Sequence, residues 1–143
     1  MNMRKIDSAA RAVRLPDTAL SHLRTLTVNI VCFDQYTKRI RLSEDLAFAL
    51  GLMKTAAIIP IQSKGLLMVA ETLPYKDAIP VSLENNGGAK TIYNYGVVDL
   101  LIEVFGLDFT HNRNKYFKNI TLKTLRGTPV ALINILDEAN LGY

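Results

Sequence analysis

The chain has 143 residues, of which 49% are hydrophobic and 21% are charged, and its net charge at pH 7 is +4. This composition predicts a folded chain with a hydrophobic core and excludes a disordered protein. No apolar run approaches the ~18 residues of a membrane-spanning helix, and no hydrophobic segment of a secretory signal follows the basic N-terminus. Together with a single cysteine, Cys32, these features lead us to expect a cytoplasmic protein without a membrane partner.

Charged residues are grouped along the chain. Residues 1–41 carry eight Lys or Arg and three Asp or Glu, residues 42–110 carry four and eight, and residues 111–126 carry five and none. Two basic segments therefore flank an acidic one. Such segments attract a phosphate backbone, although a solvated basic surface explains them almost as well.

The first elements expected are a basic arm and a β-hairpin. Residues 1–24 form the arm, with one short helix from Ile6 to Val13. Residues 25–33 alternate as a strand, and a turn leads to a second strand at residues 38–42. We expect Cys32 to be a small buried hydrophobe of the first strand. The apolar face of that strand carries Leu26, Val28, Ile30 and Cys32.

A short capped helix follows this hairpin. Ser43 offers a hydroxyl as the N-cap, and Gly51 can take the left-handed conformation that ends a helix. The apolar face carries Leu46, Ala49 and Leu50. A second hairpin is expected from residues 56–61 and 66–70, so that residues 25–72 read as a hairpin–helix–hairpin unit.

This order of elements resembles the DNA-contacting half of the AbrB-type swapped-hairpin family, in which a basic strand precedes a short helix ending in Leu-Gly-Leu or Leu-Gly-Ile. The resemblance covers residues 36–72, with Ser43 in place of the family's proline and no glycine-acid turn after the helix. It implies a double-stranded DNA partner, contacted by Lys38, Arg39 and Arg41. It also implies interleaved hairpins, supplied either by two chains or by two copies within this one. The matching residues are Arg39, Ile40, Leu42, Leu46, Leu50, Gly51 and Leu52.

The second half of the chain reads as a linker and a second unit. Residues 73–90 form the linker, with an edge strand at residues 79–83 and a turn at residues 84–88. Residues 91–143 form the second unit, with a helix at residues 97–107, a polar basic segment, and a hairpin from residues 119–125 and 128–136. The end of the chain, from Asp137, is expected to fray.

A weak internal repeat relates the two units. The helix-ending glycines Gly51 and Gly106 are 55 positions apart, and the hairpin glycines Gly65 and Gly127 are 62 apart. Duplication and chance both explain this spacing.

The basic segment around residues 111–118 mixes cations, amides and aromatic rings, which are the groups that meet phosphates and bases. It gives Arg113, Lys115 and Lys118 as a second DNA contact. The alternative is an ordinary loop in which Tyr116 and Phe117 anchor the following hairpin to the core.

Catalytic and metal-binding patterns were not found. Cys32, His22 and His111 are too few for structural zinc, and no phosphate-binding glycine loop is present. We therefore expect neither an enzyme nor a cofactor. The sequence predicts a small α+β domain, rich in β-hairpins and barrel-like, with two short helices. Its expected function is non-catalytic DNA binding, for example in transcriptional control; the alternative is a structural component of a homo-oligomer or virion-like particle. A homo-oligomer, most simply a dimer, is expected because hairpin edges pair with other chains.

Overall fold

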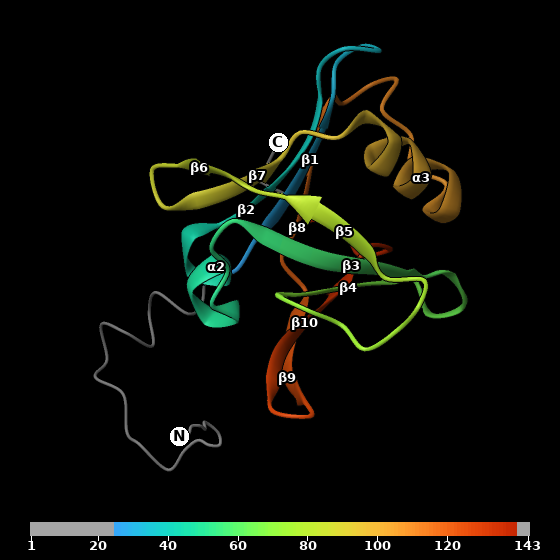
Figure 1. The fold of residues 1–143 in the computed structure, drawn as a ribbon. Helices are drawn as coiled ribbons and strands as arrows, with labels where there is room; N and C mark the ends of the chain where they lie inside the picture. Colours follow the sequence, from blue (N-terminus) through green and yellow to red (C-terminus); the bar gives the residue numbers. More distant parts are fainter. Residues whose placement is uncertain (1–24, 140–143) are drawn as a thin grey trace.

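The computed structural model describes residues 25–139, so the expected basic arm and its helix lie outside the described residues. Two antiparallel sheets and two helices enclose one hydrophobic core (Figure 1). The predicted α+β domain rich in β-hairpins is therefore confirmed. The helices are α2 (Glu44–Leu50) and α3 (Tyr95–Phe105), with a 3-10 turn η1 (Gln62–Lys64). The strands are β1 (Val28–Cys32), β2 (Lys38–Leu42), β3 (Thr55–Ile61), β4 (Leu66–Ala70), β5 (Ile79–Ser82), β6 (Glu84–Asn86), β7 (Ala89–Ile92), β8 (Asn114–Phe117), β9 (Ile120–Leu125) and β10 (Thr128–Asn134).

Both helices begin and end where side-chain and backbone chemistry favours it. The Ser43 hydroxyl accepts a hydrogen bond from the backbone N–H of Leu46, and Gly51 ends α2 in the left-handed conformation, as predicted. Helix α3 begins two residues earlier than expected, because the Asn94 side chain accepts from the N–H of Val97 and caps it. Gly106 ends it.

The first sheet has the order β6-β7-β2-β1-β8, which places β2 at its centre. Its core face carries a row of isoleucines in direct register, Ile30 on β1, Ile40 on β2 and Ile92 on β7, each at most 1% exposed. Side chains alternate between the faces of a strand, so the residues between these isoleucines point away from the core. Helix α3 packs against β2 on the core side.

The second sheet has the order β5-β3-β4-β10-β9, and β9 and β10 form the hairpin that projects at the bottom of Figure 1. Its core-facing side chains include Ile58, Leu67 and Ile133, all at most 1% exposed. Pro129 precedes the part of β10 that pairs with β4, so its missing N–H removes no bond between those strands. Strand β5 lies at an edge of this sheet, as expected for the proline-containing segment.

The two halves of the chain contribute equivalent pieces to both sheets. Each helix follows a hairpin, β1–β2 before α2 and β6–β7 before α3. The strands that lead into the helices, β2 and β7, are antiparallel neighbours in one sheet, and β4 and β10 are antiparallel neighbours in the other. Val69 faces Ala131 across β4 and β10, and these two positions are separated by the 62 residues of the sequence repeat. Each half of the chain thus supplies one β-hairpin to each sheet.

Several local expectations were wrong. Residues 84–88, expected as a turn or linker, form β6 and the tight turn that leads to β7. Strand β8 lies inside the polar basic segment, where no strand was expected, because it pairs with β1. Glu138, expected to fray, bridges to Phe117. Cys32 is partly exposed at the end of β1 opposite Lys38, and the fully buried residue there is its neighbour Val31.

Candidate nucleic-acid interface

Strand β2 separates the predicted basic residues onto two faces of the first sheet. Ile40 and Leu42 point into the core, with at most 1% of each exposed. Arg39 and Arg41 point to the opposite face, as predicted from the strand period. Because Lys38 has the parity of Ile40, it belongs to the core side, at the end of the strand.

Lys38 is held by a carboxylate of α3. Its Nζ lies 2.6 Å from Oδ1 of Asp99, and the lysine side chain is 14% exposed. The hydrogen bond to Asp99 raises the pKa of Lys38 above its ordinary value of 10.5. This ion pair joins β2 to α3, so Lys38 stabilises the packing of the helix and, unlike Arg39 and Arg41, is held by a carboxylate.

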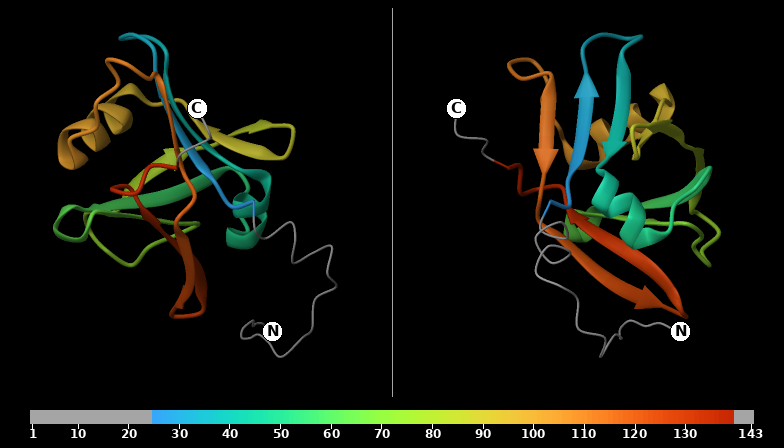
Figure 2. Two further views of the ribbon diagram at one scale, coloured as in Figure 1. Left: turned by 180° about the vertical axis from the view of Figure 1, so that it is seen from behind. Right: turned by 90° about the vertical axis from the view of Figure 1, so that its left-hand side faces the viewer.

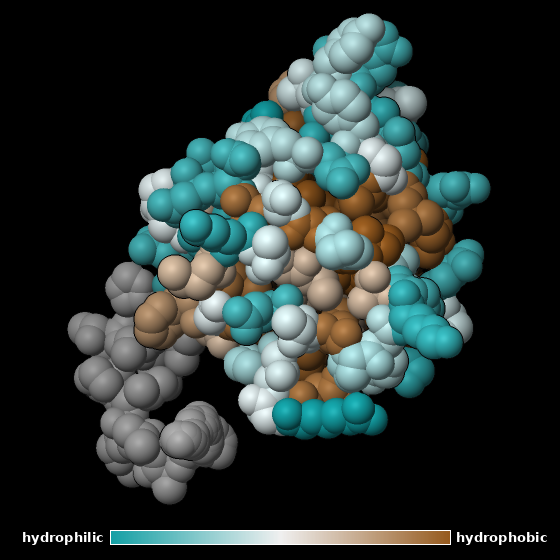
Figure 3. Space-filling model, in the orientation of Figure 1, coloured by the Kyte–Doolittle hydropathy of each residue, from teal (hydrophilic) through white to brown (hydrophobic). Residues whose placement is uncertain are grey.

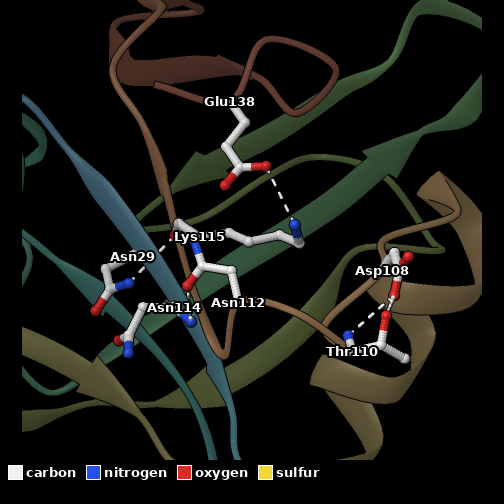
Figure 4. A network of polar contacts seen from close by, with 7 residues as sticks. All are labelled: Asn29, Asp108, Thr110, Asn112, Asn114, Lys115 and Glu138. Carbon is white, nitrogen blue, oxygen red and sulfur yellow. Dashed lines mark hydrogen bonds and ion pairs between the residues drawn. The ribbon is translucent and has the colours of Figure 1, made fainter. Parts of the chain in front are cut away.

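Lys115 also lies on the core side, because it is in direct register with Ile30. Its Nζ is 3.1 Å from Oε1 of Glu138 and 5.3 Å from the centre of the Phe109 ring. Figure 4 shows the Lys115 side chain directed toward Glu138 and away from the side chains of Asn29 and Asn114. The ammonium group of Lys115 therefore interacts with Glu138 and the Phe109 ring inside the protein.

The opposite face of the sheet, which we call the outer face, has basic, amide and aromatic side chains in two rows. One row crosses the strands as Tyr116, Asn29 and Arg41 and continues through buried Thr91 to the exposed carboxylate of Glu84. The other row is Asn114, Val31 and Arg39. Val31 is completely buried although it lies on this face. In the right-hand view of Figure 2, β8, β1 and β2 lie side by side with α3 behind them.

Neither arginine of the outer face is neutralised by a neighbour. Arg41 is exposed and Arg39 partly exposed. Within residues 25–139, no ion pair or side-chain hydrogen bond involves either guanidinium, in contrast to Lys38 and Lys115. Neither guanidinium is therefore held by an ion pair with a described residue, although the carboxylate of Glu44 lines the same hollow as Arg41.

Each arginine lines a hollow. The Arg39 hollow has a volume of about 260 Å³, and the rings of Tyr36, Tyr93 and Tyr95 line it together with Thr37 and Lys38. These tyrosines are 68%, 57% and 49% exposed. Tyr36 comes from the β1–β2 turn, and Tyr93 and Tyr95 come from the junction of β7 and α3. The hollow therefore combines one free guanidinium with three exposed aromatic rings.

The Arg41 hollow, of about 310 Å³, is more polar. Its walls carry the ring of Tyr116, the amide of Asn29 and the carboxylate of Glu44 beside Arg41. Thr27, Ser43, Gly87 and Ala89 complete it. Asn29 donates to the backbone carbonyl of Lys115 at 3.2 Å, which fixes its amide across β1 and β8. Glu44 is the one carboxylate among the described residues that line either hollow.

The turn that carries Tyr36 is fixed by Asp34. Its Oδ1 accepts hydrogen bonds of 2.7 Å from the backbone N–H groups of Tyr36 and Thr37. These bonds favour the ionised form and lower the pKa of Asp34 below its ordinary value of 3.8. Asp34 therefore holds the backbone of the turn at the residue that carries the Tyr36 ring.

The remaining predicted contacts lie away from the two hollows. Arg113 is exposed, and its guanidinium donates to the carbonyl of Phe33 at the β1–β2 tip. Its own carbonyl accepts from the N–H of Cys32 at 3.0 Å. Lys118 is exposed directly after β8, and within the described residues it has no ion pair. Phe117 is fully buried, whereas Tyr116 lies on the outer face, so the two adjacent rings have different roles.

Sequence reasoning missed the rings of Tyr36 and Tyr93 and the amide of Asn29. Tyr93 and Arg39 are far apart in the sequence and meet only because β7 pairs with β2. The one available signal was the sequence Tyr93-Asn94-Tyr95, two exposed-type aromatic residues around a helix cap.

Residues 25–139 contain no group of three or more His, Cys, Asp or Glu side chains placed to bind a metal ion. Neither of the described helices has the length and apolar composition to cross a membrane. Comparisons with protein-family models, curated proteins and solved structures found no match to this chain.

Proposed function

We propose that the protein binds nucleic acid, without catalysing a reaction, through the outer face of the first sheet. The observation that carries this proposal is the contrast among the four cations of β2 and β8. Lys38 and Lys115 are bound by carboxylates, whereas Arg39 and Arg41 have no such partner in residues 25–139. DNA is the nucleic acid that the resemblance implies, and transcriptional control is one use of such binding.

Two arginines on one strand suit a phosphate backbone. Residues two apart in a strand lie roughly 6–7 Å apart on the same face, so both guanidinium groups reach the same bound chain. Arginine meets phosphate through two parallel N–H donors, which gives strong and oriented contacts. Exposed Arg113 and Lys118 lie at the two ends of the edge strand β8 and add positive potential.

Binding of a labelled oligonucleotide at several salt concentrations tests the proposal. Arg39→Ala combined with Arg41→Ala removes no core side chain, so circular dichroism should remain that of the wild type. The double variant should bind more weakly, and the slope of log affinity against log salt should fall by about 0.7 to 0.9 for each lost phosphate contact.

A charge-matched control separates contact from net charge. Lys76 and Lys123 are exposed, one in the loop before β5 and one on β9 of the second sheet. Lys76→Ala combined with Lys123→Ala lowers the net charge by the same amount but should change affinity little. Equal losses in both double variants would mean that net charge alone drives binding and that the outer face is not the contact.

Assembly into a homo-oligomer is the second candidate function, and exposed apolar side chains favour it. Phe48 is 83% exposed, and Met53 and Leu136 are each 70% exposed. Figure 3 also displays hydrophobic surface around α3 and β5. Light scattering at tens of micromolar tests this candidate, since an oligomer of this kind persists at that concentration. A monomer that binds no nucleic acid at low salt would contradict both candidates. A cytoplasmic location, where a lone cysteine stays reduced, suits either function.

A further inference from the structure

We propose that the outer face binds a single strand of nucleic acid, with phosphates on Arg39 and Arg41 and bases stacked on the surrounding tyrosines. This inference rests on the proposed function and specifies its ligand. Three observations lead to it: the position of β2 within the sheet, the charge of the hairpin tip, and the distribution of the tyrosines.

The position of β2 disfavours reading of a duplex. The arginines lie on the central strand of five, with two neighbouring strands on each side. Five strands at the usual spacing are about 19 Å wide, whereas the major groove of B-DNA is about 12 Å wide. Readers of the major groove use a helix or a two-stranded ribbon, which fit that width. The sheet that carries Arg39 and Arg41 is too broad to bring them to base edges inside the major groove.

The tip of the β1–β2 hairpin does not provide a narrower ribbon for this purpose. The tip projects beyond the rest of the sheet at the top of Figure 1. Its five residues, 33–37, contain Asp34 and no Lys or Arg. The pKa of Asp34 is lowered, so this carboxylate is charged at neutral pH. Insertion of the tip into a groove would bring the Asp34 carboxylate between two rows of phosphates, with the guanidinium of Arg113, which donates to the carbonyl of Phe33, as its nearby cation.

The tyrosines instead form a surface on which unpaired bases can stack. Four of the six tyrosines of the chain line the two hollows: Tyr36, Tyr93, Tyr95 and Tyr116. A base has two flat faces that can stack on any aromatic ring, but inside a duplex both faces are already covered by neighbouring bases. Each hollow places at least one ring beside one arginine, which is the combination that single-strand binders use for base and phosphate together.

Single-stranded and duplex oligonucleotides of the same sequence distinguish the two ligands. We expect the wild-type protein to bind the single strand more tightly than the duplex, with a salt slope of about 0.7 per phosphate contact. Comparison of the affinities for the single-stranded DNA and the single-stranded RNA of this sequence shows which of the two is the preferred ligand. Because the chain has no tryptophan, stacking can be followed directly as quenching of tyrosine fluorescence.

Aromatic substitutions then test stacking separately from charge. Tyr36→Ala should weaken single-strand binding by about 5- to 150-fold and leave the salt slope unchanged, since no phosphate contact is removed. Tyr36→Phe keeps the ring and should bind as the wild type does. Tyr75→Ala is the matched control, because Tyr75 is 43% exposed in the loop before β5 and lines neither hollow.

The outcomes separate this inference from the proposed function. Tighter binding of the duplex, or unchanged single-strand affinity in Tyr36→Ala and in Tyr93→Ala, would overturn the single-strand inference while nucleic-acid binding by the arginines stands. Absence of binding to both ligands at low salt would overturn both. Loss of affinity in Tyr75→Ala equal to that in Tyr36→Ala would show that the tyrosines do not act through the two hollows.

Discussion

The ammonium group of Lys115 and the carboxylate of Glu138 lie 3.1 Å apart and join β8 to the segment that follows β10. The lysine side chain is 11% exposed, and its ammonium lies over the ring of Phe109. Lys115 therefore connects the edge strand β8 to the segment after β10. Its substitution should change stability, whereas substitution of a ligand contact should change affinity.

Lys115→Met should reduce stability and leave nucleic-acid affinity unchanged. The substitution keeps the apolar stem but removes the ion pair and the cation–π contact, which together are worth about 1 kcal/mol at a partly exposed site. Urea unfolding measures the free energy of unfolding, and the oligonucleotide titration measures affinity. A salt slope that falls in Lys115→Met would contradict the structural assignment of this lysine.

Phe117→Ala should destabilise the fold strongly. Phe117 is completely buried, and removal of such a ring costs about 3–5 kcal/mol of unfolding free energy through lost burial and a residual cavity. Phe48→Ala is the control, because that ring is 83% exposed, and its cost should stay below about 1 kcal/mol. Similar unfolding midpoints for the two variants would mean that β8 does not contribute to the core.

Protonation of Asp34 at low pH should weaken the hydrogen bonds of the β1–β2 turn and lower the free energy of unfolding. Its folded pKa lies below the ordinary 3.8, so its stabilisation is fully present above about pH 3.8 and is lost as pH falls through the lower folded value. Asp34→Asn removes the titrating group, so the stability difference from the wild type should shrink below that value. Denaturant unfolding of both proteins between pH 6 and pH 2 measures this, and a difference that stays constant over the range would contradict it.

Gly51→Ala and Gly96→Ala should change stability in opposite directions. Gly51 has a φ of +64°, where an L-residue costs roughly 1–2 kcal/mol, and no atom would contact its new Cβ. Gly96 lies within α3, where alanine is favoured by up to about 1 kcal/mol. Thermal unfolding of the two variants provides the comparison, and destabilisation by both would show that helix propensity does not govern α3.

The elements that sequence reasoning located are those that short-range signals define. Gly51 and Gly106 end helices through backbone conformation, and the hairpins around Gly65 and Gly127 follow from alternation beside a turn. By contrast, β6 consists of Glu84–Asn86 and contains no apolar residue, so no alternation marks it. It becomes a strand because β7 pairs with it, and that pairing depends on the sheet as a whole.

In the candidate site, too, sequence reasoning located only what short-range signals define. A period of two placed Arg39 and Arg41 on one face, since alternation is a property of one strand. The face of Lys115 required knowledge of β8 and of its pairing with Ile30, and the presence of Tyr93 beside Arg39 required the pairing of β7 with β2. These are contacts between distant segments, which a local pattern does not specify.

The sharing of both sheets between the two halves of the chain makes each half an incomplete protein. The loop at residues 71–78 connects them and is largely exposed. A protease that cuts this loop would leave two fragments held together by the pairing of β2 with β7 and of β4 with β10. Expressed separately, each fragment would expose half a core, and the two should regain structure only when mixed. Recovery of structure only on mixing is the result expected for two halves joined by a short tether, and a folded structure in either fragment alone would contradict it.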